Sequence, residues 1–195
     1  MPTYRLDEAL TRIEHYVTDV GDTVEDADVD RILSFDHEDD ETYWLRGHRC
    51  SMDDHSYLVV GNERLRFLGV LYTYDLRSAV RMHVDHELDE ATDELFSEID
   101  PERLDDLTYR LQKLSAGSDC LVDFLGDDTR PNRLVVERQI FPYERAFGVS
   151  DFASAKDSVV RLGSLAKRGV ERAITVDVDE QTPTETTVSV SPDRI

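Results

Sequence analysis

The sequence offers few residues that form covalent or metal cross-links. Its 195 residues include only two cysteines, Cys50 and Cys120, and they lie far apart in the chain. No C-x-x-C pair occurs, so neither a disulfide framework nor a zinc site is expected. Each cysteine falls in a segment with the composition of a strand, and we therefore predict two buried free thiols in a reducing compartment.

Long apolar segments are also missing. The apolar runs are only a few residues long, whereas a membrane-spanning helix needs about 20. The first ten residues, MPTYRLDEAL, contain no basic region followed by an apolar one, the pattern typical of a secretory signal. We expect a cytoplasmic protein that makes no membrane contact.

Catalytic signatures are equally scarce. There is no G-x-S-x-G nucleophile motif, and the glycines form no G-x-x-x-x-G-K-[ST] phosphate loop. Paired carboxylates occur throughout the chain, so no single pair indicates acid–base chemistry. We therefore predict no catalytic residues, no cofactor and no enzymatic activity.

Charge of one sign dominates what is present. The chain has 43 acidic and 22 basic residues, a net charge of −21, and only three of the basic residues are lysines. An acidic excess with scarce lysine resembles proteins of salt-in halophilic archaea, and the alternative is an ordinary acidic cytosolic protein. Such a charge concerns solubility and environment rather than fold, and it disfavours general binding to nucleic acids or anionic membranes.

The first 75 residues read as one helix followed by strands. A helix is predicted at 4–20, with Gly21 as its stop and one apolar stripe formed by Leu6, Leu10, Ile13, Val17 and Val20. Residues 21–41 are predicted as an acidic loop, although Arg31–Phe35 also fits a short edge strand. Three strands, at 43–50, 57–60 and 65–74, are then expected to form an antiparallel meander.

Residues 76–98 fit two patterns. Alternating apolar residues predict a strand at 78–84, which we favour, followed by helical turns from residue 87. The competing helical stripe runs through Val80, Val84, Leu88, Ala91 and Leu95.

Residues 101–172 carry the clearest pattern. Pro101 opens a helix predicted at 101–116, Gly117 ends it, and its stripe is Leu104, Leu107, Leu111 and Leu114. Alternation predicts hairpin strands at 119–125 and 133–141. A second helix, 150–172, has one apolar seam formed by Phe152, Ala155, Val159, Leu162, Ala166 and Gly169.

Together these elements predict an α+β fold. An antiparallel sheet, made of a three-strand meander plus a hairpin, is flanked by helices in the order α-β-β-β-α-β-β-α. The predicted parts are an N-terminal helix (1–20), an acidic loop (21–41), an α+β domain (42–175) and an acidic tail (176–195). The tail is expected either to be loose or to add one edge strand through Thr187–Val190.

This order of elements resembles the type III secretion chaperone-like fold, and within it the YbjN-like family. The segments that carry the resemblance are DPERLDDLTYRLQKLSAG, CLVDFLG, RLVVERQIFP and VSDFASAKDSVVRLGSLAKRGVERAI. The resemblance spans roughly residues 42–172, and the stretches 21–42 and 76–98 depart from it. It implies an α+β homodimer that holds other proteins or acts in sensory regulation, with no catalytic residues.

One histidine-containing segment is the best metal candidate. On a helix, His83, His86, Glu87 and Glu90 would share a face and present nitrogen and oxygen ligands. On a strand, His83 and His86 point to opposite faces. Because acids near any histidine are expected by chance in so acidic a chain, we interpret the segment as a solvated polar face and predict no metal site.

A local excess of basic residues indicates where a partner binds. Residues 129–172 contain nine basic and five acidic residues, whereas the other 151 residues carry a net charge of −25. Internal ion pairing is the simplest explanation, and a nucleic-acid site is an alternative that molar salt would weaken.

The hairpin supplies a second indication, because both of its faces are partly apolar and both need a cover. We therefore predict a non-catalytic, protein-binding homodimer with a possible protein client. The alternatives are a small-molecule or metal-binding regulatory domain and a nucleic-acid-associated regulator. The predicted partner-binding residues are Val135, Phe141, Arg161, Lys167, Arg168 and Arg172.

Overall fold

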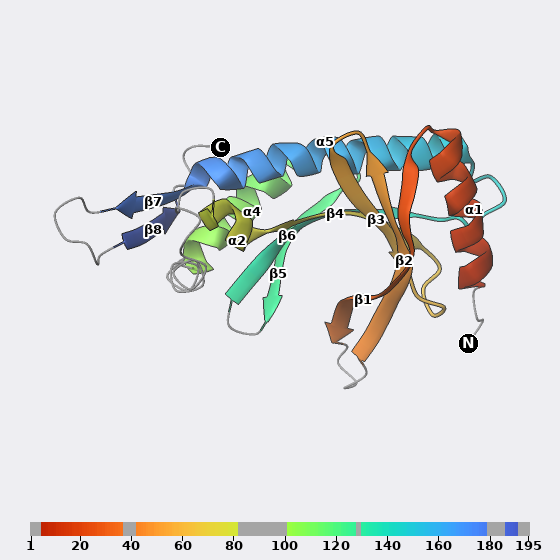
Figure 1. Cartoon of the computed structure of the whole chain (residues 1–195), viewed down its shortest axis with the longest axis horizontal. Helices are drawn as coiled ribbons and strands as arrows, with labels where there is room; N and C mark the ends of the chain where they lie inside the picture. The colour runs from red at the N-terminus through yellow and green to blue at the C-terminus, as the bar shows by residue number, and fades with distance from the viewer. Residues whose placement is uncertain (1–4, 37–41, 82–100, 128–129, 179–185, 191–195) are drawn as a thin grey trace. The chain divides into compact units, whose positions relative to one another are not determined.

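The computed structural model describes the backbone of residues 5–36, 42–81, 101–127, 130–178 and 186–190, and side chains within 5–25, 45–80, 105–125 and 132–174. The chain divides into two compact units, Met1–Tyr72 with Glu137–Arg161 and Thr73–Val136 with Leu162–Ile195. Figure 1 shows the elements in chain order: α1 (Leu6–Asp19), β1 (Thr23–Asp36), β2 (Thr42–Met52), β3 (His55–Gly61), β4 (Leu68–Asp75), α2 (Leu76–Arg81), α4 (Pro101–Ser115), β5 (Leu121–Asp127), β6 (Arg130–Ile140), α5 (Val149–Ala173), β7 (Ile174–Val178) and β8 (Thr186–Val190).

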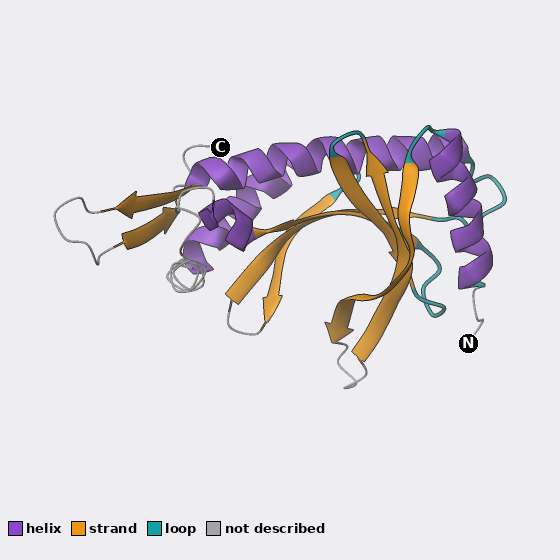
Figure 2. Ribbon diagram, in the orientation of Figure 1, coloured by secondary structure: helices purple, strands orange, loops and turns teal. Residues whose placement is uncertain are grey.

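Six of the strands form one antiparallel sheet, which confirms the predicted α+β fold class. Its strand order is β1-β2-β3-β4-β6-β5, so the meander and the later hairpin meet where β4 lies beside β6. Strands β7 and β8 pair only with each other, and Figure 2 shows them as a separate hairpin. Among the helices in the described part of the chain, none is both long and apolar enough to cross a membrane.

Helix α1 packs its predicted apolar stripe inward and ends as its sequence indicates. Leu6, Ile13 and Val17 are buried. Gly21 adopts φ +85°, a conformation in which a side chain is strained. The amide of Gly21 donates to the carbonyl of Thr18, and the amide of Asp22 to that of Val17, both at 3.0 Å. This is the Schellman arrangement, and it turns the chain so that Asp22 enters the core.

Residues 23–36 form strand β1, and the predicted acidic loop over 21–41 is wrong for this part. Strand β1 pairs antiparallel with β2 from Thr23 opposite Ser51 to Asp36 opposite Thr42, with several register shifts. Aspartate is disfavoured in strands, which is why the sequence indicates a loop. Charged and irregular edge strands are nevertheless common, because they discourage edge-to-edge aggregation.

The strand predicted at 78–84 is also wrong over its described part, because residues 76–81 form helix α2. The rest of that strand and the helical turns predicted from residue 87 lie outside the described residues. Leu76, Ala79 and Val80 are buried at helical spacing. The Asp75 carboxylate accepts a hydrogen bond of 3.0 Å from the amide of Arg77 and so caps the first turn. In the tail, Thr187–Val190 lies in β8, which pairs with β7 rather than with the edge of the main sheet.

Helix α4 buries a narrower stripe than its leucines predict. Leu107 and Leu111 are fully buried, but Leu114 is 60% exposed and Ser115 is buried instead. Gly117, at φ +91°, follows the helix as expected. The buried residues therefore continue at steps of four through Ser115, whose hydroxyl donates to the carbonyl of Gln112 at 2.8 Å.

Candidate interaction surface

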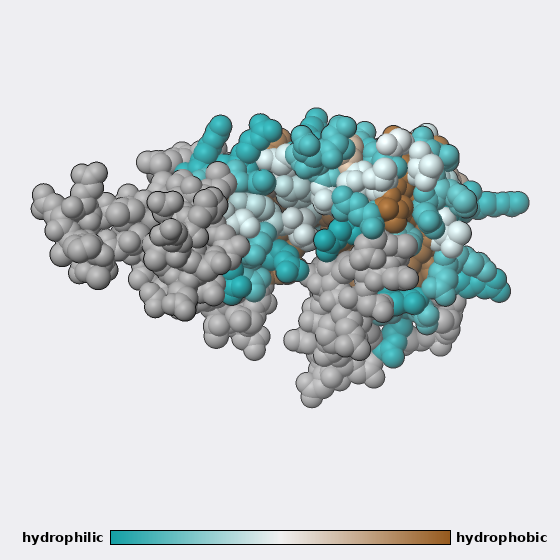
Figure 3. Space-filling view, in the orientation of Figure 1, coloured by the Kyte–Doolittle hydropathy of each residue, from teal (hydrophilic) through white to brown (hydrophobic). Residues whose placement is uncertain are grey.

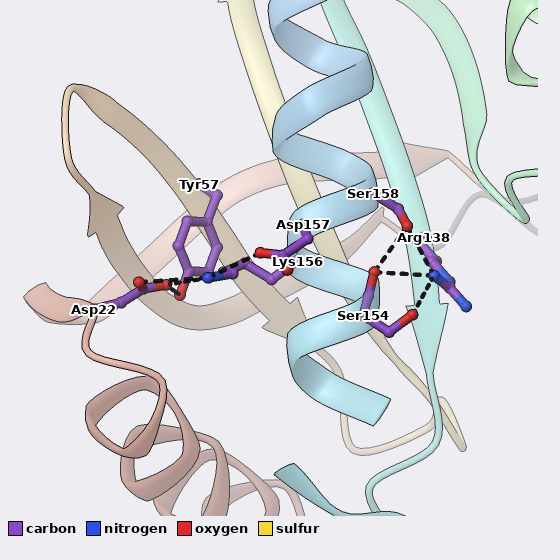
Figure 4. A network of polar contacts seen from close by, with 7 residues as sticks. All are labelled: Asp22, Tyr57, Arg138, Ser154, Lys156, Asp157 and Ser158. Carbon is purple, nitrogen blue, oxygen red and sulfur yellow. Dashed lines mark hydrogen bonds and ion pairs between the residues drawn. The ribbon is translucent and has the colours of Figure 1, made fainter. Parts of the chain in front are cut away.

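A buried ion pair lies in the core of the first unit. Lys156 on α5 and Asp22, which follows the α1 cap, have side chains only 6% and 4% exposed, with Nζ and Oδ2 3.2 Å apart. Tyr57 on β3 donates a hydrogen bond of 2.8 Å to the same Oδ2 atom (Figure 4). Lys156 Nζ also lies 3.1 Å from Oδ1 of Asp157, whose side chain is 67% exposed. Burial leaves Lys156 and Asp22 inaccessible to a substrate, so the cluster joins α1, β3 and α5 rather than forming an active site.

The sequence reasoning missed this pair, although a signal for it was present. Lys156 lies four residues after Phe152 and three before Val159, so it falls on the apolar seam of α5. A lysine at such a position needs an anionic partner in the core, because a buried unpaired charge is strongly unfavourable. The partner, Asp22, lies 134 residues away in sequence, and nothing in its local pattern identifies it.

Cys50 lies beside this cluster, opposite Tyr57 in the β2–β3 ladder. It is buried, as predicted. Burial raises the pKa of the Cys50 thiol to about 12, an effect that a hydrogen bond with Tyr57 opposes and the charge of Asp22 increases. Burial and the neighbouring Cys50 and Asp22 likewise raise the pKa of Tyr57. A thiol with so high a pKa is protonated and unreactive near neutral pH.

We expect Cys50 to make stability fall at alkaline pH. Its pKa is raised from 9.0 to about 12 on folding, so its contribution is complete below pH 9 and is lost as the pH rises towards 12. Under reducing conditions, the free energy of unfolding should therefore fall more steeply between these pH values in the wild type than in Cys50→Ala. Equal slopes, measured by denaturant unfolding, would contradict this assignment.

Arg138 is the centre of a second group of polar contacts within the first unit. Its guanidinium on β6 donates to the Ser154 carbonyl at 3.2 Å and to the Ser158 hydroxyl at 3.1 Å, both on α5 (Figure 4). The hydroxyl of Ser154 lies 3.4 Å from the same nitrogen. Arg138 therefore fixes β6 to the first half of α5 and is not available to a partner.

Lys167, a predicted partner-binding residue, is also engaged within its own unit. Its ammonium lies 5.1 Å from the centre of the Tyr74 ring and 3.7 Å from the Glu171 carboxylate. The Tyr74 hydroxyl donates to the same carboxylate at 3.0 Å. Lys167 therefore connects α5 to the end of β4 rather than extending freely into solvent.

The other three predicted basic residues on α5 behave differently. Arg161, Arg168 and Arg172 are exposed, and none forms a hydrogen bond or ion pair with the described part of the chain. Leu165, which is 54% exposed, lies between Arg161 and Arg168 on the same helix. The four residues Arg161, Leu165, Arg168 and Arg172 therefore follow one another at steps of four, three and four. Residues at these spacings share a helix face. We call Arg161, Leu165, Arg168 and Arg172 the arginine–leucine stripe. Figure 3 shows that hydrophilic residues predominate along the edge of the molecule where α5 lies.

The two predicted hairpin residues do not join this stripe. Val135 is 5% exposed, so its side chain is buried within its own chain and offers a partner little surface. Phe141 is partly exposed and packs edge-on against Phe67, with ring centres 6.5 Å apart. Leu165, which the sequence analysis did not select, could have been found from its place among the arginines.

The edge of the sheet at β5 offers limited room for a partner strand. Strand β5 is the last strand of the six. Its Val122 carbonyl accepts a hydrogen bond of 3.2 Å from the Gln112 side chain, and its Phe124 amide donates 2.8 Å to the Asp123 carboxylate. Because side chains occupy these backbone groups, addition of a partner strand along β5 is disfavoured.

The candidate metal segment containing His83, His86 and Glu90 lies outside the described residues. Within the side chains that the structure does describe, no three His, Cys, Asp or Glu residues are grouped so as to hold a metal ion.

Comparison with known proteins gives no functional information. No protein-family description and no curated protein matches this sequence. A crystal structure of an uncharacterized protein from Methanothermobacter thermautotrophicus is similar over 84% of this chain and 96% of that chain, with 10% sequence identity and a TM-score of 0.47. Similarity at this level supports no conclusion about function.

Proposed function

We propose that this chain is a non-catalytic protein of a halophile that binds another protein through the arginine–leucine stripe, in a chaperone-like or sensory role. The observation that carries the proposal is that Arg161, Arg168 and Arg172 have no hydrogen-bond or ion-pair partner among the described residues, although the chain has 43 acidic residues. The described acidic residues satisfy Arg5, Arg46 and Lys156 but leave these three guanidinium groups free. Arginine is enriched at protein interfaces and among the residues that contribute most to binding.

The position of the titratable groups supports a non-enzymatic role. Lys156 and Asp22, with Tyr57 and Cys50 beside them, are sealed in the core of the first unit. Glu137 on β6 is partly buried, and burial raises its pKa while a hydrogen bond with Gln139 opposes the shift. A general base would need neighbouring reactive groups and access to substrate, which these residues do not provide.

We expect charge reversal of the stripe to remove the chain's protein partner. The test compares tagged full-length baits, the wild type and the triple variant R161E/R168E/R172E, by quantitative capture from a halophile extract in about molar KCl, since salt at that level screens nonspecific charge contacts. A matched control is R49E/R66E/R145E, because these arginines are also exposed and without described partners. The control triple changes the net charge by the same amount as the stripe triple, because each replaces three arginines with glutamates. It leaves the stripe unaltered, because its three arginines lie elsewhere in the chain.

The proposal predicts a protein captured by the wild type and the control triple but reduced at least about tenfold with the stripe triple, the loss expected when several central contacts are reversed. Capture of the same proteins in equal amounts by all three baits would contradict it. Circular dichroism spectra should be the same for the three proteins, because every substituted side chain is exposed.

A further inference from the structure

We infer that the partner presents an acidic helix in which one large apolar side chain lies among carboxylates and packs on Leu165. This inference rests on the proposed function and specifies the chemistry of the partner. It follows from the order of groups along α5, in which one guanidinium precedes the exposed leucine and two follow it.

The spacing of the stripe matches a second helix. Arg161 and Arg172 are 11 residues apart, so the stripe extends about 16 Å along the axis at 1.5 Å per residue. A partner helix has the same rise, so an acid, an apolar residue and two further acids at i, i+4, i+7 and i+11 can meet all four groups in register. Carboxylates match the planar guanidinium with paired hydrogen bonds, which adds direction to the charge attraction.

Leu165 distinguishes this partner from a nucleic acid. A phosphate backbone has no group to cover an exposed leucine in the middle of the stripe, and no aromatic residue of the stripe can stack on bases. A long polyanion would also continue beyond the stripe towards a chain whose remaining residues are strongly acidic. A short acidic helix ends where the arginines end, and its apolar contact is not screened by salt.

A second copy of this chain fits less well. In a two-fold symmetric pair of antiparallel α5 helices centred on Leu165, Arg161 of one copy would face the Arg168 region of the other. Like charges in such positions repel. The stripe therefore favours a different, acidic protein.

The test uses full-length protein and a synthetic helical peptide that carries Glu, Leu, Glu and Glu at i, i+4, i+7 and i+11 among alanines and glutamines. Fluorescence anisotropy measures its Kd for the wild type, R168E, L165Q and the control triple R49E/R66E/R145E. We expect R168E to weaken binding at least about tenfold and the control triple to change it less than about twofold. A matched peptide in which Gln replaces Leu should bind the wild type more weakly than the original peptide does. The two peptides should bind L165Q with the same Kd, because the change in the peptide and the change in the protein remove the same contact.

Two results would overturn the inference. One is a Kd unchanged by L165Q together with tighter binding of a single-stranded oligonucleotide than of the peptide, which would indicate a phosphate ligand. The other is a captured partner, or a second copy of the chain, that depends on the stripe but is not displaced by the peptide. In the second case the proposed function stands and only the chemistry assigned to the partner fails, whereas equal capture by all three baits would remove the proposed function itself.

Discussion

Replacing Lys156 by methionine is expected to lower the free energy of unfolding by about 3–5 kcal/mol, the usual effect of removing one member of a buried ion pair. The substitution keeps most of the apolar length of the side chain but leaves the Asp22 carboxylate, 4% exposed, without its cation. The Tyr57 hydroxyl still donates to Asp22, but a neutral hydroxyl does not compensate for the buried negative charge. Urea unfolding followed by circular dichroism measures the change.

Two companion variants identify the cause. Asp157→Asn removes the exposed partner of Lys156, and it should cost less than about 1 kcal/mol, as expected for a solvent-screened ion pair. The double variant K156M/D22L removes both buried charges and should recover part of the stability lost in K156M. If K156M costs no more than D157N, the buried pair does not stabilise the core as we describe.

Replacing Gly47 by alanine is expected to destabilise the first unit by at least about 3 kcal/mol, because the added methyl group would overlap the backbone of the neighbouring strand. Gly47 lies on β2 opposite Val60 on β3. A Cβ atom there would clash with the Val59 carbonyl oxygen and would lie 2.7 Å from the Val60 Cα. Backbone atoms cannot move aside as a flexible side chain can, so β2 and β3 would have to separate.

Gly148 provides the matched control for this substitution. Among the described residues, a Cβ atom at Gly148 would meet the Asp151 carboxylate, at 3.9 Å, and no other atom within 4 Å, so Gly148→Ala should change stability by less than about 1 kcal/mol. The two alanine variants are compared by their urea midpoints. Similar midpoints for G47A and G148A would show that the close approach of β2 and β3 is not a constraint on the fold.

The elements that the sequence predicted best are those with a local cause. The seam of α5, with Phe152, Ala155 and Val159 buried, follows from helical spacing alone. Gly21 and Gly117 end their helices at positive φ, a conformation that glycine adopts most easily. The hairpin and the meander follow from alternation and turn residues in the same way.

The incorrect predictions concern segments whose structure depends on distant partners. Strand β1 forms from an acidic segment because the edge of β2 supplies backbone hydrogen bonds, an effect that residue propensity does not contain. Helix α2 depends on a cap from Asp75 and on the burial of Leu76, Ala79 and Val80. In both segments tertiary contacts override the local pattern.

The candidate surface was predicted in part. The excess of basic residues in 129–172 directed attention to α5, but the sequence could not separate the arginines that bond within the chain from those that have no partner among the described residues. Arg138 bonds to α5 and Lys167 to Glu171, whereas Arg161, Arg168 and Arg172 have no described partner. Val135 was selected from strand alternation, which shows the face of a residue but not what covers that face.

Site-specific photo-cross-linking tests the central claim most directly. A photoreactive amino acid replaces Leu165 in one variant and Leu121 in a control variant. Leu121 is a suitable control because it is 65% exposed and lies on β5, which is not part of the stripe. Irradiation in a halophile extract should give a discrete adduct with another protein from position 165. This adduct should be absent when the substitutions R161E, R168E and R172E are introduced into the same chain, and position 121 should give no such adduct. Equal adducts from both positions, or an adduct from 165 that persists in the charge-reversed background, would contradict binding through the arginine–leucine stripe.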